Sequence, residues 1–333
     1  MSTRRRPGRP TILRLALFAA LFLLAAGGTA RAQAASCSAS MSALNFGVVD
    51  MTLGTAIDTS ATYSISCTGQ AGRTIRLCLN IGEGAYASPG AGVRLMSNGT
   101  SNMRFGIYTN AARTTVWGSY WWSQWATYPA VQLDLTLGGG GAASTSRTVY
   151  GRILASQQTL TTGAYSNAFS SYDSVLEYGY QDGSDCDSGA FITNYAYPAF
   201  TASATYSPVC RVSATNMNFP TTGLLTSNVD QTSSLSLTCS NGTPWTTGLN
   251  NGTGVGASGP TDRRMTGPAA ARIVYGLYRD AARSLPWGAT AGQTSAGTGT
   301  GLSQAATVYG RVAPQTTPAP GLYSDTIVVT VTY

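Results

Sequence analysis

Residues Arg104 to Gly118 read RFGIYTNAARTTVWG, and residues Val274 to Gly288 read VYGLYRDAARSLPWG. The pentapeptide TVYGR also occurs twice, at 148–152 and at 307–311. These offsets of 170 and 159 residues are far longer than the roughly 20–50 residues of a solenoid repeat. The chain therefore contains two copies of one domain in tandem.

Each copy begins at a cysteine. Cys37 opens the segment CSASMSALNF, and Cys210 opens the segment CRVSATNMNF. The 333 residues suit two domains, since single domains usually run to about 100–200 residues. We predict a signal peptide at 1–34, an N-terminal domain at 35–205 and a C-terminal domain at 206–333.

The first 34 residues have the pattern of an export signal. Several arginines precede the apolar run Leu15 to Ala26, and small-x-small cleavage sites follow at 30–32 and 32–34. The apolar run is shorter than the about 20 residues that cross a bilayer. We expect cleavage within 32–35 and export of the mature chain.

The basic net charge of +7 comes mostly from this signal, which holds six of the 20 basic residues. The remaining 14 arginines face 13 acidic residues, and the chain has neither lysine nor histidine. Nucleic-acid binding needs clustered positive charge, so we exclude it. Without histidine or lysine, Ser-His-Asp catalysis, His-ligated zinc and Schiff-base chemistry are also excluded. We expect a non-enzymatic protein with no catalytic, cofactor-binding or metal-binding residues.

Six cysteines in an exported chain predict disulfides. Cys37 and Cys67 are 30 residues apart, and Cys210 and Cys239 are 29 apart at equivalent places in the repeat. Equivalent cysteines should form equivalent bonds, and this leaves Cys78 to pair with Cys186. The alternative is that some of the six remain free thiols.

Alternation of apolar and polar residues predicts an all-β fold of two sandwiches. Strands are expected at 63–67, 73–80, 235–239 and the C-terminus, and short helical turns at 110–113 and 280–283. Strands at 175–180 and 200–206 would complete the first domain without outside help, pinned by Cys186. The C-terminal strand should have one face made of Tyr323, Asp325, Ile327, Val329, Val331 and Tyr333.

An insertion in the first copy carries an aromatic cluster. Twenty-nine residues separate Gly118 from Thr148, against 18 between Gly288 and Thr307. We predict an adhesive loop for a hydrophobic surface or an unknown receptor, because exposed aromatic clusters mark interaction sites. Its residues are Tyr120, Trp121, Trp122, Trp125 and Tyr128. The alternative is that these rings fill a larger core; Trp117 has a counterpart in Trp287 and should lie in the core.

These motifs together resemble the spore coat protein U domain. The residues that carry the resemblance are SAT-x-M-x-F after the first cysteine, LYRDAARSLPWG, TVYGRV and the closing PGLYSDTIVVTVTY. The second copy matches throughout 210–333, and the first matches at its start, at 104–118 and at 148–166. Such domains occur in spore coat proteins and in subunits of archaic, Csu-type chaperone–usher pili.

The resemblance implies an immunoglobulin-like sandwich that lacks one strand. A periplasmic chaperone would fill the gap first, and the adjacent pilin subunit would then donate an N-terminal strand during assembly at an outer-membrane usher. After cleavage, only two to four residues would precede Cys37, too few to donate a strand. These expectations favour the two-domain tip adhesin of a pilus, serving attachment and biofilm formation. The alternatives are a structural coat protein and a carbohydrate-binding module whose tryptophans stack on sugars.

Overall fold

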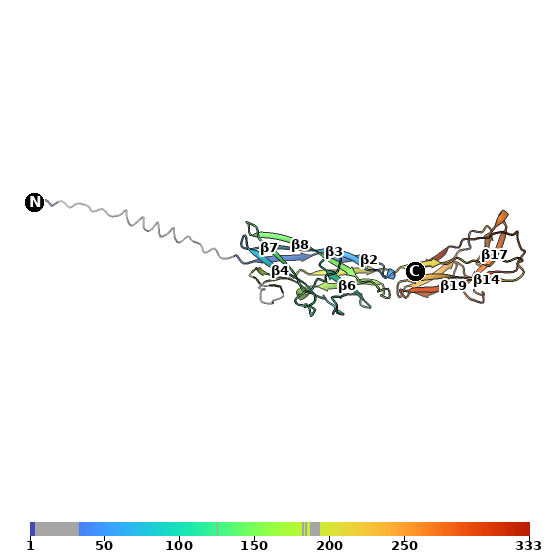
Figure 1. Ribbon diagram of the computed structural model, residues 1–333, viewed down its shortest axis with the longest axis horizontal. Helices are drawn as coiled ribbons and strands as arrows, with labels where there is room; N and C mark the ends of the chain where they lie inside the picture. The colour runs from blue at the N-terminus through green and yellow to red at the C-terminus, as the bar shows by residue number, and fades with distance from the viewer. Residues whose placement is uncertain (4–32, 125, 182, 184, 187–193) are drawn as a thin grey trace.

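The computed structural model describes residues 1–3, 33–124, 126–181, 183, 185–186 and 194–333. Almost all of the expected signal peptide lies outside these ranges. Figure 1 shows two bodies of β-structure lying end to end, the N-terminal one in blue to green and the C-terminal one in yellow to red. Apart from short 3-10 turns, the ordered elements described are strands, so the predicted all-β class is confirmed. No helix in the described ranges is long and apolar enough to cross a membrane.

The N-terminal domain packs a large sheet against a small one. In the eight-stranded sheet the order is β1 (Ser36–Met41), β3 (Ile57–Thr68), β8 (Ala142–Ile153), β6 (Asn102–Tyr108), β5 (Arg94–Ser97), β9 (Gly163–Phe169), β12 (Phe200–Tyr206) and β2 (Leu44–Val49). In the four-stranded sheet the order is β11 (Asn194–Ala196), β10 (Ser174–Tyr180), β4 (Thr74–Ile81) and β7 (Val131–Thr136). Neighbouring strands are antiparallel except β12 and β2, which are parallel.

The C-terminal domain repeats this plan with fewer strands. Its larger sheet has the order β13 (Cys210–Ala214), β14 (Val229–Cys239), β19 (Ser303–Val312), β17 (Arg272–Tyr278) and β16 (Arg263–Thr266). Its smaller sheet has the order β18 (Ser295–Thr298), β15 (Pro244–Leu249) and β20 (Val329–Thr332). These orders match β1-β3-β8-β6-β5 and β7-β4-β10 of the first domain, so the tandem repeat is visible in the topology.

The strands form where the sequence alternates. In β3 every second residue from Ala61 to Cys67 is buried while those between are exposed, as expected for a strand that covers a core with one face. The repeated tryptophans lie in the two cores, as predicted. Trp117 Nε1 donates to the Leu79 carbonyl and Trp287 Nε1 donates to the Thr247 carbonyl, both over 3.0 Å.

The repeated AAR and TVYGR motifs meet at one aspartate in each domain. The Asp58 carboxylate lies 3.2 Å from Arg113 Nη1 and 2.7 Å from Arg152 Nε. The AAR segment is a turn rather than the predicted helical turn, and its arginine adopts a φ of 57°. The motifs thus tie the turn after β6 to β3 and β8. The second domain makes the same contacts with Asp230, Arg283 and Arg311.

Each domain also buries one arginine that caps carbonyl groups. Arg94 Nη2 donates to the carbonyls of Ile81 and Trp117, both over 2.7 Å. Arg263 Nη2 repeats this with the carbonyls of Leu249 and Trp287, at 3.1 and 2.8 Å. Burial lowers the pKa of Arg94 to about 9 and that of Arg263 to about 10, which leaves both mainly charged at neutral pH.

Strand β12 completes the first domain from within. It pairs antiparallel with β9 from Phe200 to Tyr206, and its other edge pairs with β2. The strand predicted at 200–206 is therefore confirmed, as is the one at 175–180, which forms most of β10. The second domain has no corresponding strand among the described residues.

The C-terminal strand is shorter than predicted, and this prediction was wrong in extent. Only Val329–Thr332 forms a strand, whereas 321–328 lies outside the named strands. The corresponding segment of the first domain is β9, which gains its regular pairing from β12. Without such a neighbour the second copy keeps one isolated bridge, between Thr266 and Ser324. Its side chains still alternate between half-buried and exposed.

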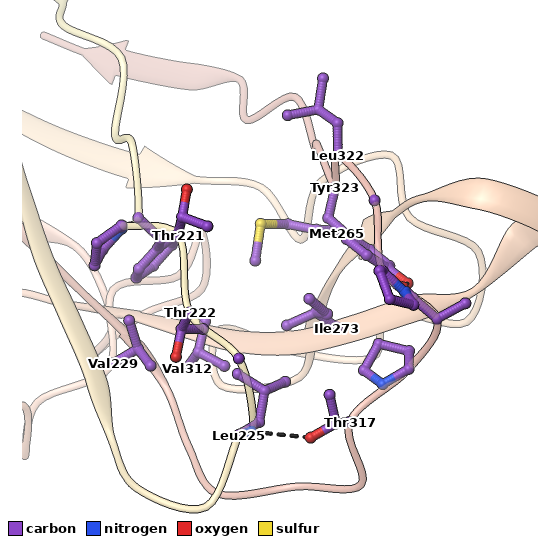
Figure 2. Close-up of a pocket in the computed structure, with 17 residues that line it drawn as sticks. Thr221, Thr222, Leu225, Val229, Met265, Ile273, Val312, Thr317, Leu322 and Tyr323 are labelled. Carbon is purple, nitrogen blue, oxygen red and sulfur yellow. Dashed lines mark hydrogen bonds between the residues drawn. The ribbon is translucent and has the colours of Figure 1, made fainter.

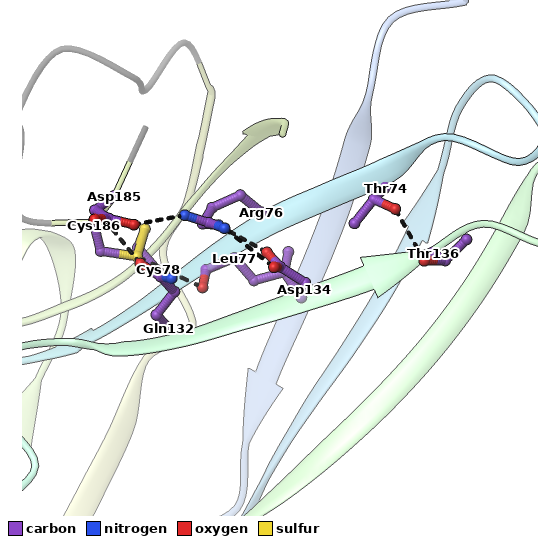
Figure 3. A network of polar contacts seen from close by, with 9 residues as sticks. All are labelled: Thr74, Arg76, Leu77, Cys78, Gln132, Asp134, Thr136, Asp185 and Cys186. Atoms are coloured by element: carbon purple, nitrogen blue, oxygen red, sulfur yellow. Dashed lines mark hydrogen bonds and ion pairs between the residues drawn. A yellow bond between two sulfur atoms is a disulfide. The ribbon is translucent and has the colours of Figure 1, made fainter. Parts of the chain in front are cut away.

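Three disulfides join Cys37 to Cys67, Cys78 to Cys186, and Cys210 to Cys239. These are the pairs that the repeat predicts, and no cysteine is free in the described residues. Figure 3 shows the bond of Cys186 beside a polar network on the outer face of the small sheet, where Arg76 contacts Asp134 at 2.7 Å and Asp185 at 2.9 Å. A segment of the tail is thereby fixed over β4.

Candidate functional site

The C-terminal domain has an open groove. Two adjoining cavities of about 400 and about 460 Å³ lie between the segments 214–225 and 317–329. Figure 2 shows Thr221 and Thr222 on one side of the first cavity, Leu322 and Tyr323 on the other, and Met265 between them. A hydrogen bond of 2.9 Å from Leu225 N to Thr317 Oγ1 closes one end. We call this feature the acceptor groove.

In the first domain, a strand occupies the position that is equivalent to the acceptor groove. Aligning Cys37 with Cys210 places β2 on the segment 217–222, and aligning Tyr165 with Tyr323 places β9 on 321–327. Both tyrosines make the same bond, since Tyr165 Oη donates to the Thr161 carbonyl at 2.5 Å and Tyr323 Oη to the Ala319 carbonyl at 2.6 Å. Between β2 and β9 lies β12. The acceptor groove is therefore the position of β12, left open in the second domain.

The core beneath the groove is correspondingly less covered. In the first domain Met96 and Met103, a pair across β5 and β6, are fully buried. Their counterparts Met265 and Ile273, the same pair across β16 and β17, are only half-buried and line the groove. Apolar side chains that a strand covers in one copy thus remain accessible in the other, and covering them would release water from apolar surface.

The walls of the groove also offer unused main-chain groups. Ser324 bonds to Thr266 in both directions, so the main chain of its neighbours points the other way, toward the groove. Within the described part of the chain, the main-chain N–H and C=O of Tyr323 and Asp325 make no hydrogen bond. Such a row is an open strand edge that can pair with another chain.

The residues of the predicted C-terminal pilin strand fall into two groups. Tyr323, Asp325 and Ile327 line the groove. Val329 and Val331 lie on β20, where they pair with Leu249 and Thr247 of β15. The remaining member, Tyr333, is exposed at the end of the chain.

An aromatic surface lies on the first domain, and only part of it is the predicted loop. Ring centroids follow one another from Tyr120 to Trp121 at 5.8 Å, to Tyr172 at 5.2 Å, to Tyr197 at 5.9 Å and to Tyr195 at 6.4 Å. The exposed fractions of the last four side chains are 46% for Trp121, 57% for Tyr172, 46% for Tyr197 and 42% for Tyr195. We call these five residues the aromatic strip. They come from three segments: the insertion, the 3-10 turn η2 (Ser171–Asp173) and the β11 region.

Trp122 does not belong to this surface, and its predicted place in an adhesive loop was wrong. Its side chain is 3% exposed. The ring packs under the insertion against Arg94 and Tyr128, with centroid distances of 4.6 and 6.3 Å, and its Nε1 donates to Glu83 at 3.2 Å. The half-buried Tyr128 supports Trp122 rather than facing a partner. Trp125 lies outside the described residues.

A buried carboxylate lies beneath the aromatic strip. Glu177 points from β10 to the outer face of the small sheet, is 1% exposed, and accepts a hydrogen bond of 2.5 Å from Trp121 Nε1 through Oε1. Its Oε2 has no hydrogen-bond partner among the described residues. Burial raises the pKa of Glu177, while the bond from Trp121 and the nearby Asn80 side chain oppose the shift.

Sequence reasoning missed Tyr172, Tyr195 and Tyr197. Tyr172 is 51 residues from Trp121 in the sequence, and β11 returns along β10 so that Tyr195 pairs with Glu177. The tyrosines in the tail of the first copy could have indicated that this segment adds to the aromatic surface. The tail completes the fold of the first domain and also contributes Tyr195 and Tyr197 to the aromatic strip.

The described residues show no sign of a catalytic centre. No group of three or more His, Cys, Asp and Glu side chains in these ranges could hold a metal ion. The largest pKa shifts away from the strip belong to Tyr63, Arg94, Arg263 and Tyr275, and burial is the main cause of each.

Comparison with known proteins identifies solved structures with a similar fold. No curated protein matches the chain. A solved structure with a TM-score of 0.53 and 16% identity, covering 90% of this chain and all of the other, is the CsuC–CsuE chaperone–tip adhesion subunit complex from archaic Csu pili of Acinetobacter baumannii. The CupB6 tip adhesin of Pseudomonas aeruginosa matches with a TM-score of 0.37 and 11% identity, over 90% of this chain and 94% of the other.

The family model for the Spore Coat Protein U domain matches residues 23–170 and 196–330. The two matches follow the two copies of the repeat and together cover most of the chain. The two copies share a strand order, the motif arginines and a pair of bonded cysteines. The chain belongs to the Spore Coat Protein U domain family, with two of its domains in tandem.

Proposed function

We propose that this chain is the tip adhesin subunit of an archaic chaperone–usher pilus, a non-enzymatic protein that mediates surface attachment and biofilm formation. Its C-terminal domain (206–333) accepts a donor strand, and its N-terminal domain (35–205) carries the adhesive surface. The protein is exported through the periplasm and stands at the end of the fibre.

The observation that carries the proposal is the difference between the two copies. The first domain holds β12 between β2 and β9, and the second has an acceptor groove in the same place. A domain with an open edge and a half-covered core gains stability from an added strand, whose main chain pairs with the edge while alternate side chains enter the groove. A domain that supplies its own strand needs no such partner.

The proposed partners follow from this groove. A periplasmic chaperone occupies it first, and the adjacent pilin subunit occupies it at an outer-membrane usher. The fold likeness to a tip subunit solved with its chaperone supports this assignment. On the N-terminal domain, the exposed aromatic strip supports an attachment role, because contiguous exposed aromatic groups mark interaction sites.

The groove can be tested with the chain's own strand. Nineteen residues separate Tyr180 at the end of β10 from Phe200 at the start of β12. A copy of residues 198–207 is therefore added after Tyr333 through a flexible linker of this length. The expected result is a rise of at least about 5 °C in the unfolding temperature of the C-terminal domain, which corresponds to about 1 kcal/mol.

The matched control is the same extension with two of its three alanines replaced by arginine. These alanines correspond to Ala202 and Ala204, which face the core of the first domain. The control should leave the unfolding temperature unchanged. An equal rise with both extensions, or no rise with either, would contradict the groove assignment.

The position in the fibre is tested on intact cells by immunogold electron microscopy with antibody against the N-terminal domain. Single grains at the distal ends of thin fibres are expected. Grains along the shaft would contradict a tip subunit, and a uniform layer without fibres would indicate a coat protein instead.

A further inference from the structure

The aromatic strip is specific to the first domain. The second copy has no aromatic residue between Gly288 and Thr307, and the sheets formed by its described residues include no counterpart of β11. The strip is therefore not required by the shared fold. Four neighbouring rings, each more than two-fifths exposed, cost free energy in water unless a partner covers them.

The orientation of the rings argues against a flat partner. The interplanar angles along the strip are 89° between Tyr120 and Trp121, 47° between Trp121 and Tyr172, and 84° between Tyr172 and Tyr197. Only the last pair, Tyr197 and Tyr195, is nearly parallel, at 15°. A smooth solid could touch the faces of few of these rings at once. A ligand with faces at several angles can contact them in succession.

The polar groups of the strip point to a partner rich in hydroxyl groups. Four of the five rings are tyrosines, whose phenol groups donate and accept hydrogen bonds. Beneath Trp121 lies the carboxylate of Glu177, with one oxygen engaged by the indole and the other without a donor in the described residues. A buried acceptor without a partner is costly, and an O–H group of a ligand that enters beside the indole would satisfy it.

The charge around the strip limits the ligand further. The four close arginine–ring contacts of the described residues involve Tyr180, Trp122, Tyr150 and Tyr309, none of them in the strip. The only charged side chain bonded to the strip by a described contact is the acidic Glu177. An anionic ligand would meet a negative charge and no positive one, so a neutral ligand is favoured.

We propose that the aromatic strip binds a neutral glycan, with sugar rings stacked on Trp121, Tyr172 and Tyr197. The apolar C–H face of a pyranose covers each ring, and its hydroxyl groups bond to the phenols and to the carboxylate under Trp121. Glu177 holds the indole through Nε1 with one oxygen and offers the other to a ligand hydroxyl. This inference rests on the proposed adhesive role of the N-terminal domain and names its ligand.

The test measures binding of the full chain, purified with its added C-terminal strand, to immobilised oligosaccharides. The panel consists of hexaoses of β-1,4-glucose, β-1,3-glucose, β-1,4-mannose and β-1,4-galactose, with sialyllactose as an anionic comparison. Saturable binding to at least one hexaose and none to sialyllactose is expected, together with a change in tryptophan fluorescence in solution. Absence of saturable binding to all four hexaoses overturns the proposal.

Variants locate the site. Trp121→Ala and Tyr197→Ala should each weaken hexaose binding at least about tenfold, the loss expected when a stacking partner is removed. Tyr333→Ala removes an exposed tyrosine of the other domain and should leave affinity unchanged. Glu177→Gln keeps an oxygen acceptor for the indole and removes the charge, so it should weaken binding while the fluorescence of the free protein is preserved. Equal affinity of Trp121→Ala and the natural chain overturns the proposal.

The outcome is separable from that of the proposed function. If Trp121→Ala abolishes adsorption to polystyrene while no hexaose binds, the strip contacts apolar surfaces and the glycan proposal fails, although the adhesin stands. If a hexaose binds but immunogold grains are absent from fibre ends, the tip assignment fails instead. Addition of the binding hexaose to cells distinguishes the glycan's source: it blocks cell-to-cell aggregation if the glycan is a matrix polysaccharide, and attachment to foreign cells otherwise.

Discussion

The guanidinium of Arg94 lies 4.6 Å from the ring centroid of Trp122. Arg94 is itself fully buried, and its Nη1 has no hydrogen-bond partner in the described part of the chain. Carbonyl groups accept hydrogen bonds from its Nε and Nη2, and the Trp122 ring adds a cation–π contact to the guanidinium. In the second domain Arg263 Nη1 instead donates to the Pro260 carbonyl at 2.7 Å, so the insertion of the first copy replaces a carbonyl by a ring.

This contact predicts that Trp122 stabilises the domain rather than binding a ligand. Trp122→Ala should lower the free energy of unfolding of the N-terminal domain by about 3–5 kcal/mol, as for other buried aromatic residues. Tyr172→Ala, at an exposed position of the strip, should change it by less than about 1 kcal/mol. Urea unfolding followed by near-ultraviolet circular dichroism measures both free energies. A larger loss of stability for Tyr172→Ala than for Trp122→Ala would contradict the assignment of Trp122 to the core.

Arg263 should not tolerate lysine. Its guanidinium donates to the carbonyls of Leu249, Asn250, Pro260 and Trp287 over 2.7–3.1 Å, and an ammonium group cannot reach all four at once. Arg263→Lys should cost about 2–4 kcal/mol, since at least two buried carbonyls lose their donor. The control is Arg272→Lys, at an exposed position on β17, which should be neutral in the same thermal unfolding assay.

Acid should weaken both domains through the repeated aspartates. The hydrogen bond from Arg152 lowers the pKa of Asp58, and the bond from Arg311 lowers that of Asp230. A carboxyl with a lowered folded-state pKa adds stability above its unfolded pKa of about 3.9, and this stability is lost as pH falls through the folded value. Unfolding temperatures should therefore drop below about pH 4.

The aspartates are about one-third exposed, so solvent screening keeps each contribution modest. The double variant Asp58→Asn, Asp230→Asn should be less stable at neutral pH and should show a flatter decline between about pH 4 and pH 2. An unchanged slope in calorimetry would show that other carboxylates control the acid response.

Much of the fold could be predicted because the sequence contains two copies of the same domain. Strands such as β3 and β12 alternate clearly, and equal spacing of Cys37–Cys67 and Cys210–Cys239 indicates which bonds form. The incomplete strand at 321–328 could not be read from its own residues. It alternates as well as a strand does, and what it lacks is a neighbour, which is a property of the whole sheet.

The aromatic surface was less predictable for a similar reason. Trp121 and Trp122 are adjacent and chemically equal, and it is contacts with the distant residues Arg94 and Glu83 that hold Trp122 inward. Tyr172 and Tyr197 join Trp121 because η2 and β11 lie beside the insertion in space. Composition could indicate an aromatic site in the first copy, but not its members, since these are set by long-range packing.

The internal strand offers the sharpest prediction about the difference between the domains. Ala204 on β12 is buried, whereas its neighbour Thr205 is exposed. Ala204→Arg should cost the N-terminal domain at least about 3 kcal/mol, because the side chain would place an unpaired charge in the core. Thr205→Arg should cost less than about 1 kcal/mol on the solvent face.

Hydrogen exchange resolved along the chain measures the two domains separately. Protection in β9 and β2, the neighbours of β12, should fall in Ala204→Arg, while β14 and β19 of the second domain keep theirs. Equal loss of protection in both domains would mean that they unfold as one unit. Loss confined to the first domain would show that β12 serves its own sandwich alone, as the proposed donor-strand role of the second domain requires.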